Sequence, residues 1–373
     1  MGAARAVSAG AAGLRAEYPV LRETAYLNAG TDGPVSERSV EAAAQRMRRE
    51  AERGRGMASH WDELSALRGA LRTRYAALVG AAPEEIALTR STTDGVDVAL
   101  AGLSLGLGDE VLTSDEEHVG LLAPLAGACG RCGATVRVAP FADVANAVGP
   151  RTRLVAVSHV SWMTGAMAPV TGLREAAPLL LLDGAQGAGA VPVDVGALGC
   201  DFYAASGQKW LCGPNGTGFL FVRSALLDEL GMPRPSYITL DDEADPLALQ
   251  PREGAARLDT AQPYGPVLAA ALAGLDVLEE PGWDAVFERS HALAAALRSM
   301  LADRAPPICD EPTSLVSLPV GRDPADAAAA VERLAAAGVI VRAVPGRPWL
   351  RASTGAWNSE QDLERLVAGL AGL

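Results

Sequence analysis

The stretch from residue 179 to residue 221 constrains the fold most, because short apolar runs alternate there with polar residues. Residues 179–183 are apolar up to a final carboxylate, Asp183, and a continuous apolar run of this length is typical of a buried strand in a parallel sheet. Residues 201–206 are predicted as the next strand, ending in a hydroxyl, and Lys209 follows closely. Because ligands bind outside the carboxyl ends of parallel strands, these polar groups are expected at one edge of the sheet.

The position of Lys209 follows from the strand predicted after it. Residues 217–222 begin too soon for a helical crossover, which needs about a dozen residues. We therefore expect an antiparallel strand, with Lys209 in a Gly- and Pro-rich reversal above the edge. A carboxylate and a lysine converging on a phosphate-sized space point to pyridoxal phosphate (PLP). Lys209 would form the Schiff base, and Asp183 would keep the pyridine nitrogen protonated.

Composition limits the classes of partner. The net charge is −13, and an acidic chain without basic clusters argues against nucleic acid and anionic membranes. No apolar run approaches the length of a membrane span, and residues 1–17 are expected to be a mobile tail. The five scattered cysteines favour a reduced compartment, which predicts a cytoplasmic enzyme. Cys129 and Cys132 form a lone C-x-x-C pair, so no metal site is predicted.

The motifs of the central stretch carry a family resemblance. D-G-A-Q from Asp183, followed by S-G-x-K-x-x-x-G-P-x-G-x-G from Ser206, resembles class V aminotransferases, which include cysteine desulfurases, isopenicillin N epimerase and C–S lyases. The resemblance extends from about Tyr26 to the C-terminus. It implies an α/β PLP-dependent transferase fold like that of aspartate aminotransferase. A large domain (25–280) would hold a mostly parallel seven-stranded sheet, with a small α+β domain formed by 281–373 and 1–24.

A phosphate site is expected where a predicted strand, residues 86–89, runs into S-T-T and a helix. Hydroxyls and N–H groups at a helix start bind anions, although ordinary N-capping explains the same residues. The resemblance identifies this context as the family's phosphate-binding cup, which implies Thr92, Thr93 and Ser206 as ligands. Gln208 replaces the His of desulfurases and is retained as a further phosphate donor.

The remaining cofactor contacts are implied by the resemblance alone. His118, in an E-H pair after a predicted strand, would stack its imidazole on the pyridine ring. Gln186 would contact the phenolic oxygen of PLP. The family is homodimeric with shared active sites, and Gln262 would reach the phosphate of the partner.

The resemblance also implies which residues contact the substrate, which would be an α-amino acid. Asn28, in Y-L-N-x-G, would lie near the substrate at the mouth of the site. Arg351 would bind the α-carboxylate, a task for which its planar fork suits it. Trp162 stands where the family has Asn, so it either lines the pocket or marks a shift of the local alignment.

The reaction is predicted from a missing residue. Desulfurases of this family carry a nucleophilic Cys just before the carboxylate-binding Arg, whereas residues 344–350 contain none. We therefore predict β-elimination of the C–S lyase type and not the reaction of a persulfide-forming cysteine desulfurase, with epimerisation and transamination as alternatives. Two other hypotheses remain at this stage. The glycines between Gly184 and Gly189 resemble a nucleotide-binding loop, and the fold also suits a binding protein without catalysis.

Overall fold

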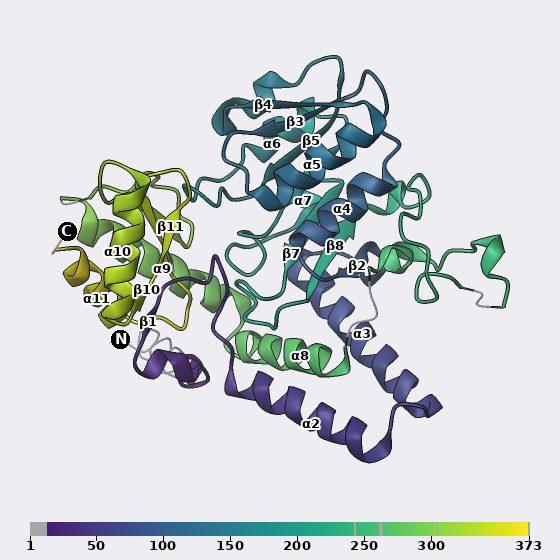
Figure 1. The fold of residues 1–373 in the computed structure, drawn as a ribbon, viewed down its shortest axis with the longest axis horizontal. Coiled ribbons are helices and arrows are strands. Elements are labelled where there is room, and N and C mark those ends of the chain that lie inside the picture. Colours follow the sequence, from purple (N-terminus) through teal and green to yellow (C-terminus); the bar gives the residue numbers. More distant parts are fainter. Residues whose placement is uncertain (1–12, 242–243, 261–263, 304, 372–373) are drawn as a thin grey trace.

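A seven-stranded sheet forms the centre of the protein (Figure 1). The computed structural model describes residues 13–241, 244–260, 264–303 and 305–371. The strand order is β2-β8-β7-β6-β5-β3-β4. The strands are β2 (Ile86–Thr89), β3 (Glu110–Ser114), β4 (Thr135–Ala139), β5 (Thr152–Ser158), β6 (Leu180–Asp183), β7 (Phe202–Ser206) and β8 (Gly218–Val222). β8 is antiparallel to both neighbours, as predicted, and the other pairings are parallel.

Helices cover both faces of this sheet. One face packs against α4 (Thr92–Gly102) and α5 (Val119–Cys132); the other packs against α3 (Ala58–Val79), α6 (Val170–Ala176), α7 (Val195–Leu198) and α8 (Gly265–Glu279). Leu180 and Leu182 belong to one buried cluster and Leu179 and Leu181 to the other. A strand buried on both sides needs apolar residues at every position, which explains the continuous run.

The small sheet has the order β11-β12-β9. Its strands are β9 (Leu315–Pro319), β11 (Arg342–Val344) and β12 (Trp349–Ser353), and the surrounding helices are α9 (Trp283–Leu301), α10 (Pro324–Ala336) and α11 (Glu360–Leu370). The sequence predicts one strand at residues 339–343. The structure divides this segment between two strands. β10 (Val339–Ile340) pairs in parallel with β1 (Ala25–Tyr26), and β11 pairs with β12. Short 3₁₀ helices complete the chain: η1 (Pro19–Arg22), η2 (Pro83–Glu85), η3 (Phe141–Ala147), η4 (Ser224–Leu226), η5 (Pro246–Ala248) and η6 (Gly254–Leu258).

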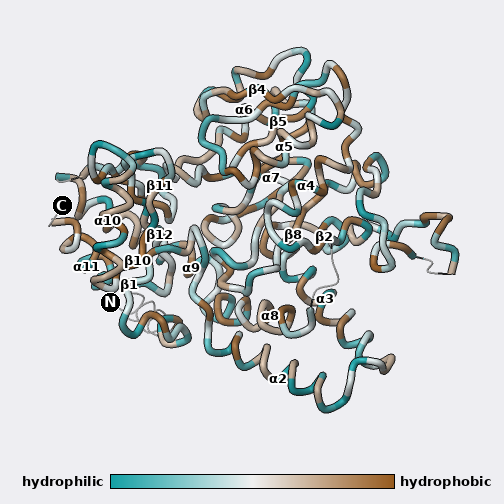
Figure 2. Tube along the Cα trace, viewed as in Figure 1, coloured by the Kyte–Doolittle hydropathy of each residue, from teal (hydrophilic) through white to brown (hydrophobic). Residues whose placement is uncertain are grey.

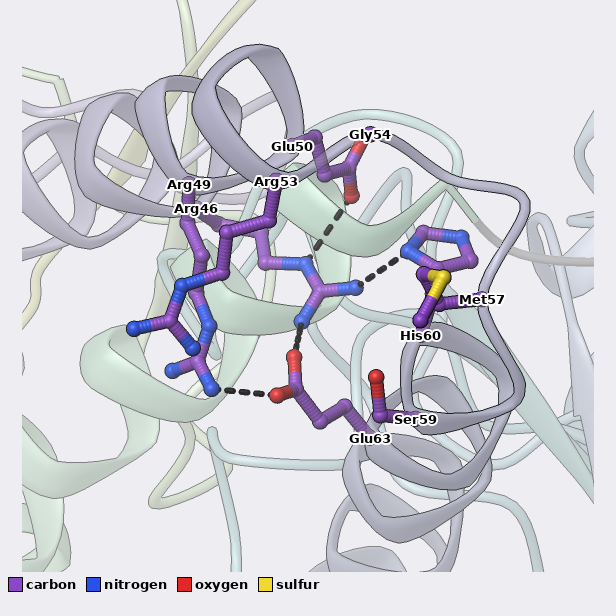
Figure 3. A pocket seen from close by; sticks show the side chains of 9 residues that line it. All are labelled: Arg46, Arg49, Glu50, Arg53, Gly54, Met57, Ser59, His60 and Glu63. Atoms are coloured by element: carbon purple, nitrogen blue, oxygen red, sulfur yellow. Dashed lines mark hydrogen bonds and ion pairs between the residues drawn. The ribbon is translucent and has the colours of Figure 1, made fainter.

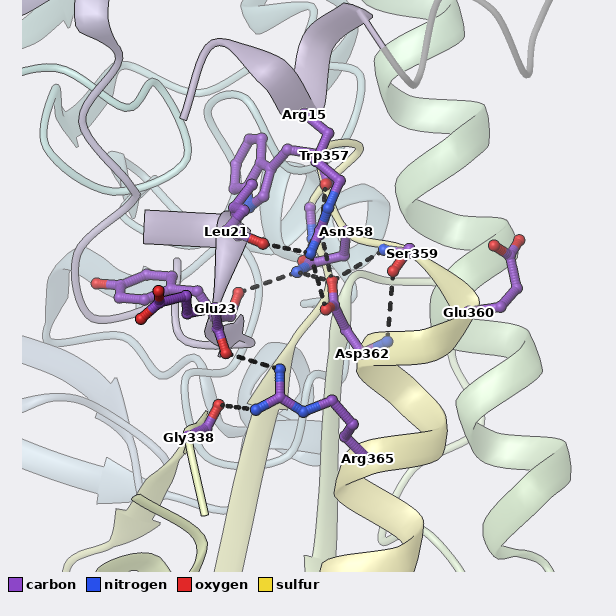
Figure 4. Close-up of polar contacts among 12 residues, drawn as sticks. Arg15, Leu21, Glu23, Gly338, Trp357, Asn358, Ser359, Glu360, Asp362 and Arg365 are labelled. Atoms are coloured by element: carbon purple, nitrogen blue, oxygen red, sulfur yellow. Dashed lines mark hydrogen bonds and ion pairs between the residues drawn. The ribbon is translucent and has the colours of Figure 1, made fainter. Parts of the chain in front are cut away.

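The N-terminal segment packs against the C-terminal part of the chain (Figure 4). Arg15 forms a bidentate pair with Asp362, with N···O distances of 2.7 and 3.1 Å, and also donates to the carbonyl oxygens of Leu21 and Trp357. Leu14 is buried. The expectation of a mobile tail is therefore wrong for residues 13–17, because tertiary contacts fix a segment whose composition alone suggested disorder. The division into domains remains a proposal.

The polar residues at the turn between α2 (Glu37–Arg53) and α3 form an ion-pair network (Figure 3). Arg46 pairs with Glu50 and with Glu63, Arg49 also pairs with Glu63, and Arg46 donates to Nδ1 of His60 at 3.1 Å. Figure 2 contrasts the polar α2 with the more apolar α8, which packs against it. None of the described helices combines the length and the hydropathy that a membrane-spanning segment needs.

Candidate active site

The polar residues singled out in the sequence meet at one edge of the large sheet. β6 and β7 are parallel, and β2 runs in the same direction because β8 is antiparallel to both β2 and β7. Their carboxyl ends therefore deliver Asp183, Ser206 and the segment before Thr92 to the same side. The predicted convergence of these residues at one edge is confirmed, and their role in ligand binding, which is expected at such an edge, stays a prediction.

Lys209 lies in a closed reversal after β7. Gly207 N donates to the carbonyl of Thr217 at 2.8 Å, and Gly213 N donates to that of Gly207 at 2.9 Å. The turn at Gly33 packs directly on this loop, since a Cβ there would lie 2.1 Å from the carbonyl oxygen of Lys209. A side chain at Gly33 would displace the loop, so the close approach fixes the backbone from which Lys209 projects.

Lys209 and Asp183 influence each other in a buried environment. Burial lowers the pKa of Lys209 to about 8; Asp183 opposes this effect, and Arg351 and Arg342 reinforce it. Burial raises the pKa of Asp183, against the charge of Lys209 and a hydrogen bond from Ala185 N. Among the described residues, no carboxylate forms an ion pair with the Lys209 ammonium. A lysine with a lowered pKa is a better nucleophile and base near neutral pH.

The start of α4 forms a cradle of hydroxyl and N–H groups. Thr92 N donates to Ser206 Oγ at 3.0 Å, and the two hydroxyl oxygens are 2.6 Å apart. Ser91 is the N-cap, accepting from Asp94 N, so ordinary capping leaves Thr92 available. Thr93 Oγ1 lies against Gly120, where a Cβ would approach it to 2.6 Å. This cradle fits a phosphate.

The side-chain amides of Gln208 and Gln186 differ in how many of their hydrogen bonds are formed within the protein. Gln208 Oε1 is buried without a partner, and turning the amide would place its NH₂ group in that position. Gln186 Nε2 donates to the carbonyl of Gly30 at 2.8 Å, while its Oε1 accepts from Trp210 Nε1 at 3.0 Å. Gln186 therefore keeps one amide N–H for the expected contact with the cofactor.

His118 is the N-cap residue of α5 and contacts Trp162. Its Nδ1 accepts from Gly120 N at 3.0 Å, and its ring meets Trp162 edge-on with centroids 4.9 Å apart. Burial, followed by the charge of Lys209, lowers the pKa of His118 to about 4. The ring is therefore neutral at physiological pH. Trp162 lines the site, which favours the first of the two alternatives considered for it.

Arg351 and Asn28 are linked by a residue that the sequence analysis passed over. Arg351 is 1% exposed and donates to Thr31 Oγ1 at 3.2 Å. Arg342 donates to the same oxygen at 3.2 Å, and Thr31 donates its proton to Asn28 Oδ1 at 2.8 Å. Asn28 thus orients the hydroxyl that receives both arginines. The hairpin pairing of residues 342 and 351 was the signal that could have identified Arg342.

Glu117 is a buried carboxyl group that the sequence analysis did not assign. It accepts hydrogen bonds from the hydroxyls of Ser114 and Ser158 and from Ser158 N at 2.9 Å. Ser158 pairs in register with Asp183 on the neighbouring strand. Burial raises the pKa of Glu117 to about 7, and the negative charge of Asp183 contributes to the increase.

Replacing Glu117 by Gln is expected to change how stability depends on pH. The folded-state pKa is raised from 4.5 to about 7, so the unfolded chain loses this proton first. The free energy of unfolding should fall as pH rises from about 4.5 to about 7, by up to about 3 kcal/mol more in the parent than in Glu117→Gln. Urea unfolding at several pH values measures this difference, with exposed Glu364→Gln as the charge-matched control. Parallel curves for the parent and Glu117→Gln would show that the carboxyl ionises normally.

Two further sequence-based expectations, the contact made by Gln262 and the nucleotide-binding loop, have different outcomes. Gln262 lies outside the described residues. The nucleotide-binding hypothesis is wrong: the segment after Gly189 leads to α7, which has only four residues, whereas that motif must open a full helix. Within the described ranges, no group of three or more His, Cys, Asp or Glu residues could hold a metal.

The residues of this edge fit PLP. The Thr92–Ser206 cradle suits its phosphate, the buried carboxylate of Asp183 suits a ring nitrogen, and Lys209 supplies an amine. The family model for aminotransferase class V matches residues 26–366. The chain belongs to the class V aminotransferase family. It is a PLP-dependent enzyme with the α/β fold of that family.

Relatives of this class V enzyme differ in activity. Isopenicillin N epimerase of Amycolatopsis lactamdurans is 32% identical over 92% of this chain and 94% of its own length. A cysteine desulfurase of Klebsiella pneumoniae (strain 342) is 35% identical, but the match covers only 58% of this chain and 59% of the desulfurase. The cystine C–S lyase C-DES, solved with its product cysteine persulfide, has a TM-score of 0.87 and is 27% identical over 95% of this chain and 99% of its own.

Lys209 also stands out by residue type. It is the only lysine among the 373 residues, and every other basic side chain apart from His is Arg. A PLP enzyme joins its cofactor to a lysine amine. A count of lysines therefore assigns this residue without any alignment.

Proposed function

We propose that the protein is a β-eliminating lyase acting on an α-amino acid, similar to C–S lyases, and not a persulfide-forming desulfurase. The observation that carries this proposal is the environment of the cysteines. A nucleophilic cysteine needs a lowered thiol pKa. Burial instead raises the pKa values of four of the thiols, those of Cys129, Cys200, Cys212 and Cys309.

The positions of the cysteines support the same proposal. Residues 345–348, between β11 and β12, form a short turn without Cys. Cys212 is close to Lys209 in sequence, but its thiol is fully buried against Tyr18. Cys132 is the last residue of α5, a helix of 14 residues, and therefore lies about 20 Å along the axis from His118.

The positions of the site residues support the following proposed roles. PLP, when bound, withdraws electrons from the Cα of the substrate. Arg351 binds the α-carboxylate, and Lys209, with its lowered pKa, removes the Cα proton. Asp183 holds the ring nitrogen, and the neutral ring of His118 packs on the cofactor. Phosphate is held by the side chains of Thr92, Thr93, Ser206 and Gln208, and Gln186 contacts the phenolic oxygen.

Product analysis tests this function. The PLP-loaded protein is incubated with cysteine, cystine and other amino acids that carry a leaving group on Cβ. Release of pyruvate and ammonia is the expected result. Nitrogen transfer to an added 2-oxo acid, without those products, would indicate transamination and contradict the proposal.

Epimerisation is the second candidate, favoured by the similarity to isopenicillin N epimerase over almost the whole of both chains. This reaction returns a proton to Cα without loss of a Cβ group. Incubation in D₂O distinguishes it from elimination. Deuterium at Cα together with the opposite enantiomer, and no pyruvate, would replace the lyase proposal by this one.

We also propose a homodimer. Exposed aromatic and sulfur-containing side chains gather near the α2–α3 turn: Met57 is 65% exposed, Trp61 49% and Tyr264 44%. Exposed apolar groups that line one surface are typical of an interaction site. The solution mass from light scattering measures the assembly, and a monomer at micromolar concentration would contradict it.

Arg351→Ala is expected to raise KM for amino-acid substrates about tenfold to a hundredfold. The substitution removes a carboxylate contact of roughly 1.5–3 kcal/mol. Initial rates at varied substrate concentration give the measurement. The control is Arg347→Ala, on the same hairpin, whose guanidinium lies over Trp349 and is exposed. An unchanged KM in Arg351→Ala would remove Arg351 from the site.

A further inference from the structure

Arg342 and Arg351 form a pair of like charges inside the candidate site. β11 and β12 pair with these two residues directly opposite each other, so both side chains project from the same face of the small sheet. Like charges in this relation destabilise a sheet. A bound anion would offset the repulsion.

The guanidinium groups of Arg342 and Arg351 lack a directly paired acidic side chain in the described protein. Throughout the described ranges, no Asp or Glu forms an ion pair with either one. Their polar contacts are to neutral oxygens: both donate to Thr31 Oγ1, and Arg351 Nη1 donates to the carbonyl of Trp162 at 2.8 Å. The Asp32 carboxylate interacts electrostatically with Arg342, but the two side chains form no ion pair.

Two unused groups beside this pair are hydrogen-bond donors. Arg351 Nε and Trp162 Nε1 are buried without partners. The guanidinium carbons of Arg342 and Arg351 lie 5.7 and 6.0 Å from the centroid of the Trp162 ring, so both groups lie close to this ring. Buried donors without acceptors are rare in native proteins. Donors of this kind are suited to an anion.

Arg351 and Arg342 differ in how deeply their side chains are buried. Arg351 is 1% exposed, whereas Arg342 is partly exposed. A single carboxylate has only two oxygens, and a bidentate contact with one guanidinium occupies both. The deeper arginine therefore suits the α-carboxylate, and the outer one remains available for a second anionic group.

We propose that the substrate is an α-amino acid whose side chain ends in a second carboxylate, bound by Arg342 with the indole N–H of Trp162 contributing. Arg342 thereby determines specificity. This inference rests on the proposed function in one respect: it takes Arg351 as the α-carboxylate ligand of a PLP enzyme.

Matched acid and amide ligands test the inference. The PLP-loaded protein is titrated with L-aspartate against L-asparagine and with L-glutamate against L-glutamine. Neither pair carries a good leaving group on Cβ, so β-elimination does not consume them. Binding is followed by calorimetry and by the visible absorption of the cofactor. In at least one pair, the acid is expected to bind about tenfold to a hundredfold more tightly than the amide.

Variants assign the preference to Arg342. Arg342→Gln should lower the affinity for the acid to that for the amide. Arg342→Lys should retain part of the preference, because lysine keeps the positive charge but lacks the planar guanidinium that binds a carboxylate with two hydrogen bonds. Arg347→Gln removes the same charge elsewhere on the hairpin and should retain the full preference. If Arg342→Gln does not fold, the comparison of acid and amide in the parent still decides.

Three outcomes would overturn the inference. Equal affinities of acid and amide in both pairs would remove the second carboxylate while leaving the proposed function in place. An equal loss for acid and amide in Arg342→Gln would mean that Arg342 shares the α-carboxylate with Arg351. If the protein binds PLP but no α-amino acid of any kind, the proposed function fails, and the inference fails with it.

Discussion

Lys209→Ala is expected to abolish turnover, by at least about a thousandfold, while the protein stays folded. The variant contains no lysine at all, so no other side-chain amine can take over the roles of nucleophile and base. The backbone hydrogen bonds of the loop involve Gly207, Gly213 and Thr217 and do not need the Lys209 side chain. Activity is measured with the substrates above, and folding by circular dichroism.

Chemical trapping gives this prediction a second readout. Borohydride treatment of the PLP-loaded parent should add one pyridoxyl group, located at Lys209 by peptide mass spectrometry. Lys209→Ala should gain none on a side chain. Lys209→Arg is the control for charge, since it keeps a cation but cannot supply a neutral amine, and it should also be inactive. Turnover retained in either variant would refute the assignment.

Asp183→Asn is expected to reduce kcat about a hundredfold to a thousandfold, the scale for loss of one preorganised electrostatic group in a buried site. Asp183 is 5% exposed, and Ala185 N is its hydrogen-bond donor at 2.9 Å. The amide keeps the shape and loses the charge. Asp194→Asn is the matched control, because Asp194 caps α7 and Asn caps equally well. An unchanged kcat would separate Asp183 from the cofactor.

The same variant should also change the titration of Lys209. The carboxylate of Asp183 raises the pKa of Lys209 against the effect of burial, so its removal should move that pKa below about 8. Because the chain has one lysine, the rate of acylation of lysine in the cofactor-free protein reports this group, with modification of the N-terminus separated by peptide mapping. A midpoint that stays the same or rises in Asp183→Asn would contradict the electrostatic coupling.

The local sequence pattern was sufficient to predict strand positions and direction in the large sheet. β2 has the predicted bounds, and β8 has the predicted direction. These features depend on the apolar period and on the length of the connections, both of which are visible in a single sequence. The division of residues 339–344 into β10 and β11 was missed, because the partner of β10 is β1, more than 300 residues earlier.

The candidate site likewise has some features that the sequence predicted and others that it did not. The sequence located Asp183, Ser206 and Lys209 at one edge, because strand order and direction carry the ends of neighbouring strands to the same place. It did not indicate that Thr31 would join Arg342 to Arg351, nor that Glu117 would be buried next to the Asp183 strand. Such contacts have no periodicity along the chain. They arise where loops from distant segments meet, and their hydrogen bonds and pKa values depend on distances and burial that exist only after the two sheets are packed together.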